Sequence, residues 1–315
     1  MPKLFVGPMS KNVVDTVIHF KEKTGVDVGF IPSRRQIDYD GGYVNNWTTK
    51  TFAEYVNGRA IIQRDHGGPA QGTLEDCGLK SFEKDTEYFD IIHIDPWKKY
   101  PSYKEGLTHT VSTIKEINKR NPQVEFEIGT EESIRPFSVE EFKALLEDTR
   151  NSLNKEVFSK IKYAVVQSGV GLNLGTQKNT GSFSRRKLIN MVEICRMFDV
   201  LSKEHNGDYL SRNNIDERFS CGLDSINIAP EFGQIETLCH LEKIKDKEEW
   251  YKICYESGKW RKWVKKDFIP EENKETLIKI CGHYTFSDPK FLGIKEDIDK
   301  MVANRILTRL RDLLL

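Results

Sequence analysis

The sequence lacks an excess of either charge. Among its 315 residues, lysine plus arginine number 48, and aspartate plus glutamate also number 48. Proteins that hold DNA or RNA by the phosphate backbone carry a basic excess, because they must neutralise those phosphates. The balanced composition therefore excludes a nucleic-acid partner from our expectations.

Long apolar runs are also missing. The chain is 38% hydrophobic and 30% charged, and no stretch approaches the ~20 apolar residues that cross a bilayer. Its start, MPKLFVGPMSKN, lacks the apolar core and small-residue cleavage site of a secretory signal. We expect a globular cytoplasmic protein with no membrane partner.

Cysteine is scarce and unpatterned. The sequence holds six cysteines and no CxxC spacing, so neither a disulfide framework nor a cysteine-rich zinc motif is indicated. Reduced thiols, as in a cytoplasmic protein, are expected at Cys77, Cys195, Cys221, Cys239, Cys254 and Cys281.

Short β-rich runs alternate with longer amphipathic stretches, without a repeat at solenoid periods. The runs cover residues 26–30, 60–63, 89–94, 124–128, 161–167, 199–202 and 225–228. Helical spacing of apolar residues marks 13–23, 139–147 and 185–198. Seven or eight strand–helix units predict a parallel sheet, either a closed (β/α)8 barrel or an open doubly wound sheet.

The ends of the strands favour the barrel. Nearly every run finishes in polar or special residues, and in a barrel all these ends converge on one face, whereas an open sheet uses mainly those near its switch point. We predict one (β/α)8 TIM-barrel domain over 1–315 with a helical elaboration over about 240–315. That elaboration is expected to surround a last strand near 277–281. The amphipathic helix at 294–315 is expected to pack on the barrel or on a second subunit.

One run, 60–63, stops abruptly at Arg64, Asp65 and His66, followed by two glycines. An imidazole at a strand end can bind a divalent metal, and a neighbouring carboxylate can move protons. The alternative is a hydrogen-bonded pair that caps the next helix. The glycines let the backbone pass close to a ligand or only make a turn. His205 also follows an apolar run, so two histidines from different strands would converge on a metal.

Two further strands carry ionisable groups at alternate positions. His93 and Asp95 lie in IIHIDPW, and Glu125 and Glu127 lie in VEFEIGTEE. Alternate residues share a face, so these side chains can point into the barrel mouth. Interior charges are costly unless they are paired or bound to a cation. Glu127 is therefore a candidate metal ligand or acid/base, with a salt bridge to an arginine as the alternative.

Basic residues near the expected mouth indicate an anionic substrate. Arg34 and Arg35 follow the run 26–30, and Arg64 follows 60–63. Guanidinium groups suit a carboxylate or a phosphate. Lys178 lies in a polar loop after a later strand, where barrels often hold phosphate; an ordinary solvated loop is the alternative.

Several motifs, in one order along most of the chain, resemble the class II ketose-bisphosphate aldolase superfamily. The closest resemblance is to its tagatose-bisphosphate aldolase subunit, usually called non-catalytic. The motifs are IPSRRQIDYDGGY, QRDHGGP, IHIDPW, EIGTEE, VVQSGV, KEHNGDYL and GHYTFSDPKF. NIAPEF also resembles a segment of the catalytic aldolases.

The resemblance implies roles for particular residues. Asp65 would be the acid/base, His66 and His205 would bind Zn²⁺, and Asn227 would touch the ketose. Glu127 would offer an alternative metal position. A zinc-bound ketone that forms an enediolate serves both aldol cleavage and epimerisation of a small-molecule sugar.

One departure divides the functional hypotheses. Catalytic members supply a third histidine from a Gly-Thr-x-His-Gly segment, whereas residues 166–171 here read VQSGVG. Gln167, Glu127, His93 or Asp95 could complete the metal shell, and Gln167 is also a candidate for substrate binding. The non-catalytic relative shares the lack. The chain is thus expected to be a lyase or epimerase and a homo-oligomer, or an accessory subunit that stabilises a catalytic aldolase.

Overall fold

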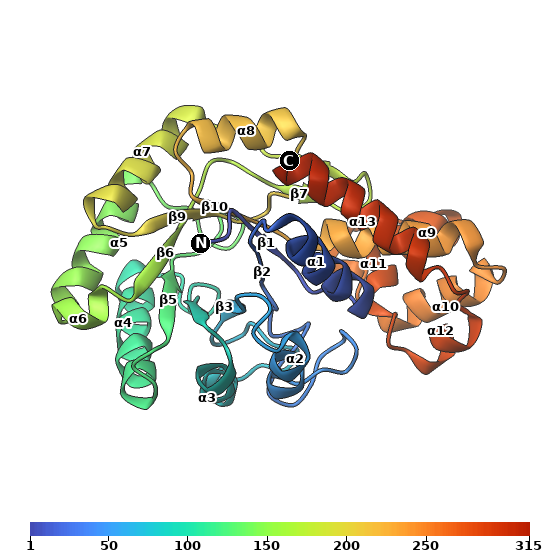
Figure 1. The fold of residues 1–315 in the computed structure, drawn as a ribbon, viewed down its shortest axis with the longest axis horizontal. Coiled ribbons are helices and arrows are strands. Elements are labelled where there is room, and N and C mark those ends of the chain that lie inside the picture. Colours follow the sequence, from blue (N-terminus) through green and yellow to red (C-terminus); the bar gives the residue numbers. More distant parts are fainter.

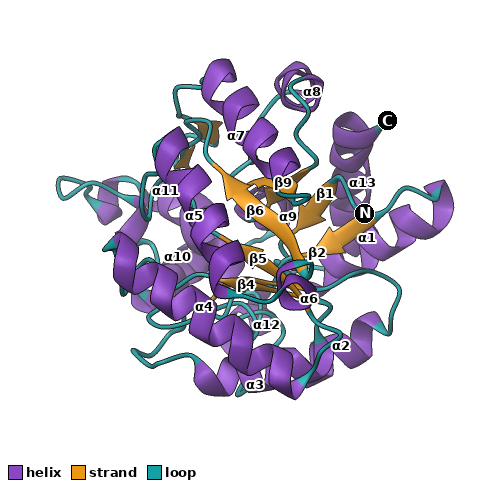
Figure 2. Ribbon diagram, turned by 90° about the vertical axis from the view of Figure 1, so that its left-hand side faces the viewer, coloured by secondary structure: helices purple, strands orange, loops and turns teal.

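The computed structural model describes residues 1–315, and its centre is a barrel of eight parallel strands (Figure 2). The order around the sheet is β2-β1-β10-β9-β6-β5-β4-β3. The strands are β1 (Leu4–Val6), β2 (Val28–Phe30), β3 (Gln63–Gly67), β4 (Ile91–Ile94), β5 (Glu125–Ile128), β6 (Ile161–Val166), β9 (Leu201–Glu204) and β10 (Ser225–Ile228).

The two end strands of this order, β2 and β3, meet and nearly close the barrel. Parallel bridges join Phe30 to Ile62 and Ser33 to Asp65. The Asp65 amide donates to the Pro32 carbonyl at 3.0 Å. The predicted (β/α)8 barrel is therefore confirmed, and its closing seam runs through one of the candidate site residues.

Helices cover the outside of the barrel (Figure 1). A core of 58 buried residues lies mainly between these helices and the sheet. Ser, Thr and Asn caps begin most of them, each accepting a backbone N–H of the first turn. The barrel helices are α1 (Lys11–Thr24), α2 (Thr49–Val56), α3 (Leu79–Tyr88), α4 (Tyr103–Arg120), α5 (Val139–Ser152), α6 (Lys155–Phe158), α7 (Arg185–Met197) and α8 (Arg212–Ser220).

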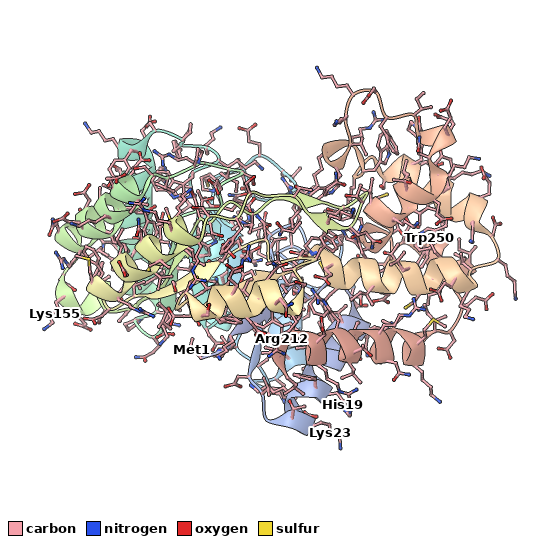
Figure 3. The ribbon with its side chains drawn as sticks, turned by 90° about the horizontal axis from the view of Figure 1, so that it is seen from above. Met1, His19, Lys23, Lys155, Arg212 and Trp250 are labelled. Atoms are coloured by element: carbon pink, nitrogen blue, oxygen red, sulfur yellow. The ribbon has the colours of Figure 1, made fainter.

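The C-terminal part is helical and holds, apart from Leu174, a second buried cluster of 13 residues around Trp250 (Figure 3). The terminal helix α13 packs on α1 and α9, so it covers the barrel itself. The helices are α9 (Pro230–Lys243), α10 (Lys247–Ser257), α11 (Lys274–Cys281), α12 (Pro289–Ile294) and α13 (Asp299–Leu314), with 3-10 turns η1 (Arg261–Trp263), η2 (Pro270–Glu272) and η3 (Gly282–Tyr284).

One strand prediction is wrong, and one strand was not predicted. The eighth strand is β1, not a segment near 277–281, which forms α11. Leu277, Ile278, Ile280 and Cys281 are all buried, and this i, i+1, i+3, i+4 spacing places them on one face of a helix. The strand β1 has only three residues, too short for a recognisable alternation.

The remaining class predictions concern thiols and membranes. All six cysteines are free, and five of them are buried. None of the helices combines the length and apolar character that a membrane span requires.

Inward-facing side chains fill the barrel in layers beneath its mouth. Phe5, Ile91 and Tyr163 form an apolar floor. Above it the ammonium of Lys203 lies 3.6 Å from the centre of the Phe5 ring and 4.0 Å from that of Tyr163. Lys203 is fully buried and pairs with Glu127 at 3.2 Å. The polar groups of the mouth therefore stand on a closed base.

Candidate metal and substrate site

A bulge in β3 directs two consecutive side chains toward the mouth. Arg64 pairs with Ile92 and Gly67 with Ile94, so three steps on β3 face two on β4. His66 has a φ of 46°, in the left-handed region. Neighbouring residues of a regular strand point to opposite faces, but the bulge re-aims His66. Asp65 and His66 can therefore serve one site.

The two glycines after His66 have a packing role rather than a role in admitting a ligand. A Cβ on Gly67 would lie 2.6 Å from the His93 carbonyl oxygen, and one on Gly68 3.2 Å from that of Asp95. Gly68 also has a φ of 130°. Side chains here would separate β3 from β4, so the glycines keep the two strands in contact.

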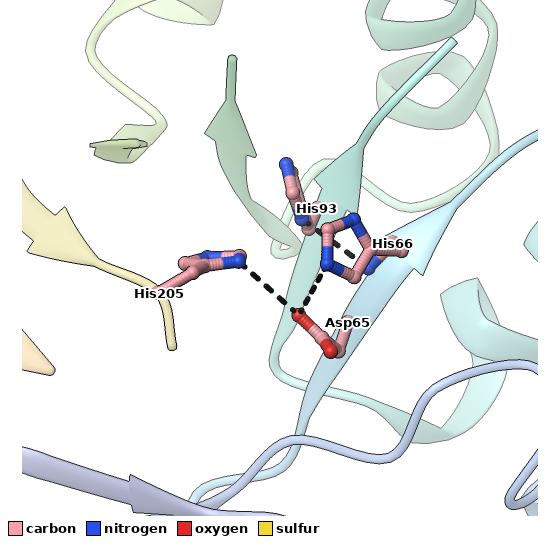
Figure 4. A group of neighbouring side chains, drawn as sticks. All are labelled: Asp65, His66, His93 and His205. Carbon is pink, nitrogen blue, oxygen red and sulfur yellow. Dashed lines mark hydrogen bonds and ion pairs between the residues drawn. The ribbon is translucent and has the colours of Figure 1, made fainter. Parts of the chain in front are cut away.

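Asp65 and three histidines gather at the mouth (Figure 4). One ligand atom from each of Asp65, His66, His93 and His205 lies within 4.8 Å of the others. Asp65 Oδ1 is 3.7 Å from His205 Nδ1 and 3.9 Å from His66 Nε2. The donor atoms are therefore close enough together to be candidate ligands of one ion.

Two buried carboxylates fix the orientation of two of these imidazoles. His66 Nδ1 donates to Asp95 Oδ2 at 2.6 Å, and His205 Nε2 donates to Glu127 Oε1 at 2.8 Å. In each ring the other nitrogen is left facing Asp65. Carboxylate–histidine pairs of this kind fix the tautomer of metal-binding histidines and raise their basicity.

The electrostatics of the cluster favour a cation. Burial opposes the charged form of His66, but Asp65, Asp95 and Glu131 outweigh burial and raise its pKa to about 10. A metal ion would therefore take the place of the proton on His66, because a histidine must be neutral to bind a metal. Oδ1 of Asp65 is buried without a hydrogen-bond partner. Such an orphaned oxygen is costly, and a proton or a hydrogen bond from a ligand would satisfy it. The donor set of imidazole nitrogen and carboxylate oxygen suits zinc, so the residues fit the metal that the resemblance implies.

His93 supplies the third imidazole from β4. Its Nε2 donates to the Gly129 carbonyl at 3.0 Å, and its Nδ1 accepts the His66 amide at 3.2 Å. Burial lowers the pKa of His93, which keeps the ring neutral. Its Nδ1 lone pair accepts the His66 amide, so His93 would have to give up this hydrogen bond to bind a metal. The histidine missing from β6 is thus replaced in the cluster by one from β4. Alternation in IIHID pointed to the mouth but could not rank His93 above the other three candidates.

Glu127 lies below the cluster rather than within it. Its carboxylate pairs with Lys203 and accepts from His205. Burial opposes its ionisation, but Lys203, His93 and His205 hold the pKa of Glu127 well below its usual range. The alternative prediction, a salt bridge from Glu127, is correct, but the partner is Lys203 and not an arginine. Glu127 is therefore placed to orient imidazoles.

Gln167 and Lys178, both predicted to bind a ligand, offer no free side-chain group to the metal cluster. The Gln167 side chain accepts from the Phe137 amide at 2.7 Å and donates to the Thr130 and Arg135 carbonyls, each at 2.8 Å. These bonds tie the loop after β5 to β6, so its predicted contact with metal or substrate is wrong. Lys178 is exposed in the hairpin of β7 (Leu172–Asn173) and β8 (Lys178–Asn179), which fits the solvated-loop alternative.

The predicted contact of Asn227 with a ketose stays a prediction. It is 3% exposed, and neither its amide nitrogen nor its amide oxygen has a partner. Buried amides are almost always hydrogen-bonded. A substrate hydroxyl or carbonyl group would satisfy both atoms.

The predicted clamp of three arginines is wrong for two of them. Arg64 is fully buried, with hydrogen bonds from its guanidinium to Asp85, Thr49 and the Pro32 and Ile37 carbonyls. Arg34 is 3% exposed and pairs with Asp38 and Asp76. The guanidiniums hold loops together instead of facing solvent. Arg35 alone lines the pocket above the cluster.

Replacing Arg64 by alanine should destabilise the fold strongly. The substitution leaves the fully buried Asp85 carboxylate without its charged partner, and breaking a buried pair in this way costs about 3–5 kcal/mol. Urea unfolding monitored by circular dichroism would measure the free energy of unfolding. Arg212→Ala, which breaks an exposed pair with Asp216, is the control and should cost less than about 1 kcal/mol. Equal losses for both variants would show that the buried pair has no special weight.

A pocket of about 300 Å³ lies above the cluster. Asp65, His66 and Glu131 line it, together with Ser33 and Asn206. Its volume is at the lower end of the range for small-molecule sites. The candidate metal cluster is therefore open to a small ligand.

Comparison with known proteins shows the fold. No family model matches the chain, and no curated protein sequence does. A Sinorhizobium meliloti 1021 protein named as a probable tagatose 6 phosphate kinase superposes with a TM-score of 0.74 at 15% identity, over 100% of this chain and 89% of that one. The YdjI aldolase from Escherichia coli K12 gives 0.60 at 12% identity, over 99% and 91%.

A fructose-bisphosphate aldolase from Campylobacter jejuni gives a TM-score of 0.56 at 11% identity, over 99% of this chain and 90% of that one. These chains are matched over nearly their whole lengths. The protein therefore has the fold of these structures, two of which are named as aldolases, in agreement with the fold that the sequence resemblance implied. At these identities the likeness concerns the fold alone.

Proposed function

We propose that the chain is a metal-dependent lyase or epimerase of the class II aldolase type, acting on an anionic ketose. One observation carries the proposal: three imidazoles and Asp65 converge at the carboxyl ends of the barrel strands, with two of the rings aimed by buried carboxylates. The aldolase fold supports the same reaction class.

His66, His93 and His205 would hold the ion, with zinc as the expected metal. When bound, a divalent ion supplies Lewis-acid polarisation of a ketone oxygen. Asp65 Oδ1 has no hydrogen-bond partner, so it can take a proton from the carbon next to that ketone. Asn227 would bind a substrate hydroxyl through its free amide. Epimerisation uses this proton transfer directly, and so does an aldolase in the condensing direction. In the cleaving direction Asp65 would take the proton of the hydroxyl group beside the breaking carbon–carbon bond, and the enediolate carbon would then be protonated.

The carboxylates that orient the imidazoles are predicted to strengthen metal binding. Asp95→Asn weakens the hydrogen bond that orients His66, and loss of such partners lowers metal affinity by about 10- to 100-fold. Competition with a chromophoric chelator would measure the dissociation constant for zinc. Asp216→Asn, at an exposed ion pair, should leave it unchanged. An Asp95→Asn protein with wild-type affinity would separate Asp95 from the metal site.

The reaction class can be tested without knowing the substrate. The metal-loaded protein would be incubated in D2O with a panel of phosphorylated ketoses and ketose acids, and NMR would follow exchange at carbons next to the carbonyl. We expect exchange with at least one compound, abolished by a chelator. Bound metal without any exchange or cleavage across the panel would contradict the proposal.

An accessory subunit of a catalytic aldolase is the second candidate. The observation in its favour is that β6 ends without a histidine and that Gln167 is bound to backbone groups instead. Affinity purification from the source cells separates the two candidates, because an accessory subunit would bring a catalytic aldolase with it. Sedimentation of the purified chain tests the other proposed partnership, a homo-oligomer.

A further inference from the structure

A lysine lies in the interior of the barrel, beneath the candidate metal cluster. Lys203 is on β9, two residues before His205, so the two side chains share the inner face of that strand. Lys203 is fully buried and is not among the residues that line the pocket above the cluster. It therefore has no contact with a ligand in that pocket, and neither the proposed metal binding nor the proposed proton transfer uses it.

The ammonium of Lys203 connects the strands that carry the site. It donates to Oε1 of Gln63 on β3 and lies 3.2 Å from Oε2 of Glu127 on β5. Gln63 comes two residues before Asp65, and Glu127 accepts from His205 Nε2. Each polar partner of the lysine is thus near to, or bonded to, a residue of the metal cluster.

Glu127 depends on this lysine for one of its two oxygens. Oε1 accepts from His205 Nε2 at 2.8 Å and lies 3.4 Å from His93 Nδ1. Oε2 forms no hydrogen bond, and its ion-pair partner is Lys203. Without the ammonium nothing would hold Oε2, and the carboxylate could turn away from His205.

Stability alone does not account for a charged pair at this depth. Both ions lose their hydration on burial, and apolar side chains of similar volume in place of a buried pair often give equal or greater stability. The ammonium lies 3.6 Å from the centre of the Phe5 ring and 4.0 Å from that of Tyr163, so a methionine would pack against the same rings. The charge of Lys203 is therefore better explained by what it does to the cluster above it.

We propose that Lys203 is a positioning residue of the metal site, which holds the Glu127 carboxylate against His205 and so keeps the His205 ring aimed at the ion. The inference rests on the proposed function, because it takes His205 as a metal ligand. Lys203 touches neither the ion nor the substrate, so its effect on metal binding passes through Glu127.

The test compares Lys203→Met with a matched control, Arg218→Met. Arg218 pairs with Glu204 at 2.6 Å, and both side chains are buried. Glu204 stands between Lys203 and His205 on β9, so it points to the opposite face of the strand. Both variants break a buried pair of the same strand and should lose stability. Competition with a chromophoric chelator should show the dissociation constant for zinc raised about tenfold or more in Lys203→Met and unchanged in Arg218→Met.

Crystal structures of the metal-free variants measure the positioning without the ion. In Lys203→Met the Glu127 carboxylate should leave His205 Nε2, whereas the 2.8 Å contact should persist in Arg218→Met. If Lys203→Met does not fold, Gln63→Leu takes its place. The Gln63 side chain accepts from Lys203, and its Nε2 has no partner, so this variant loosens the lysine and should raise the dissociation constant less, in the same direction.

Other results would overturn the assignment. Wild-type zinc affinity in Lys203→Met, or an equal loss in Arg218→Met, would make Lys203 a structural residue only. A contact between Glu127 and His205 that persists in the Lys203→Met crystal structure would reject the positioning role whatever the zinc result. A wild-type protein that binds no zinc would count against the proposed function, and the crystal structures would still decide whether Lys203 holds Glu127 against His205.

Discussion

Asp65→Asn should keep the metal but lose proton exchange at the substrate carbon by about 100- to 10,000-fold, the usual contribution of a general acid or base. Asparagine has nearly the shape of aspartate, and the Asp65 backbone bond across the closing seam does not involve the side chain. The lost property is the basicity of Oδ1, which has no hydrogen-bond partner in the wild type. Deuterium incorporation followed by NMR measures the effect.

Metal content must be measured on the same Asp65→Asn sample. Wild-type exchange in this variant would remove Asp65 from the role of base. Loss of the metal together with the exchange would make Asp65 a ligand instead, an outcome compatible with its 3.7 Å separation from His205 Nδ1. Full metal occupancy with exchange abolished is the predicted result.

His66→Ala should lower zinc affinity by more than about 100-fold, because removing a ligand costs more than removing a partner behind it. The substitution also removes the imidazole held by Asp95. Chelator competition would measure the affinity, and circular dichroism would verify the fold. If His66→Ala misfolds because of its φ of 46°, His205→Ala tests the same cluster from β9.

The control for this experiment is another histidine. His19 is exposed on α1, at the periphery of the molecule (Figure 3), and His19→Ala should bind zinc like the wild type. Zinc affinity that survives both His66→Ala and His205→Ala would contradict the ligand assignment.

The barrel could be predicted because its signals are local. Seven apolar runs that end in polar residues mark seven of the eight strands, and the convergence of those ends follows from the topology. The run 60–63 meets β3 only at Gln63, however, and Arg64, Asp65 and His66 belong to the strand instead of following it. The failures came where the local pattern was ambiguous. Residues 277–281 fit a strand by composition but are helical by the spacing of their buried positions.

The sequence predicted which residues line the site better than it predicted which groups they contact. Alternation placed His93, Asp95 and Glu127 inside the barrel, and the structure agrees. The bulge that lets Asp65 and His66 share one site depends on the pairing of β3 with β4, which no local pattern reveals. Arg64 and Arg35 look alike in sequence, yet one is a buried loop anchor and the other lines the pocket.

Two lysines of the pocket beside the cluster show the same limit. Lys98 follows β4, and Lys262 lies about 160 residues later in the C-terminal segment, yet both line one pocket. Neither stands in a motif, and only the packing of that segment over the barrel mouth brings them together.

The metal content of the untagged wild-type protein tests the central claim most directly. The protein would be incubated with excess zinc, dialysed, and measured by elemental analysis. Close to one divalent ion per chain is the predicted result, held by imidazoles of β3, β4 and β9 strand ends. A folded protein that retains no metal after this treatment would contradict the metal-dependent reaction and leave the accessory subunit as the better explanation of the fold.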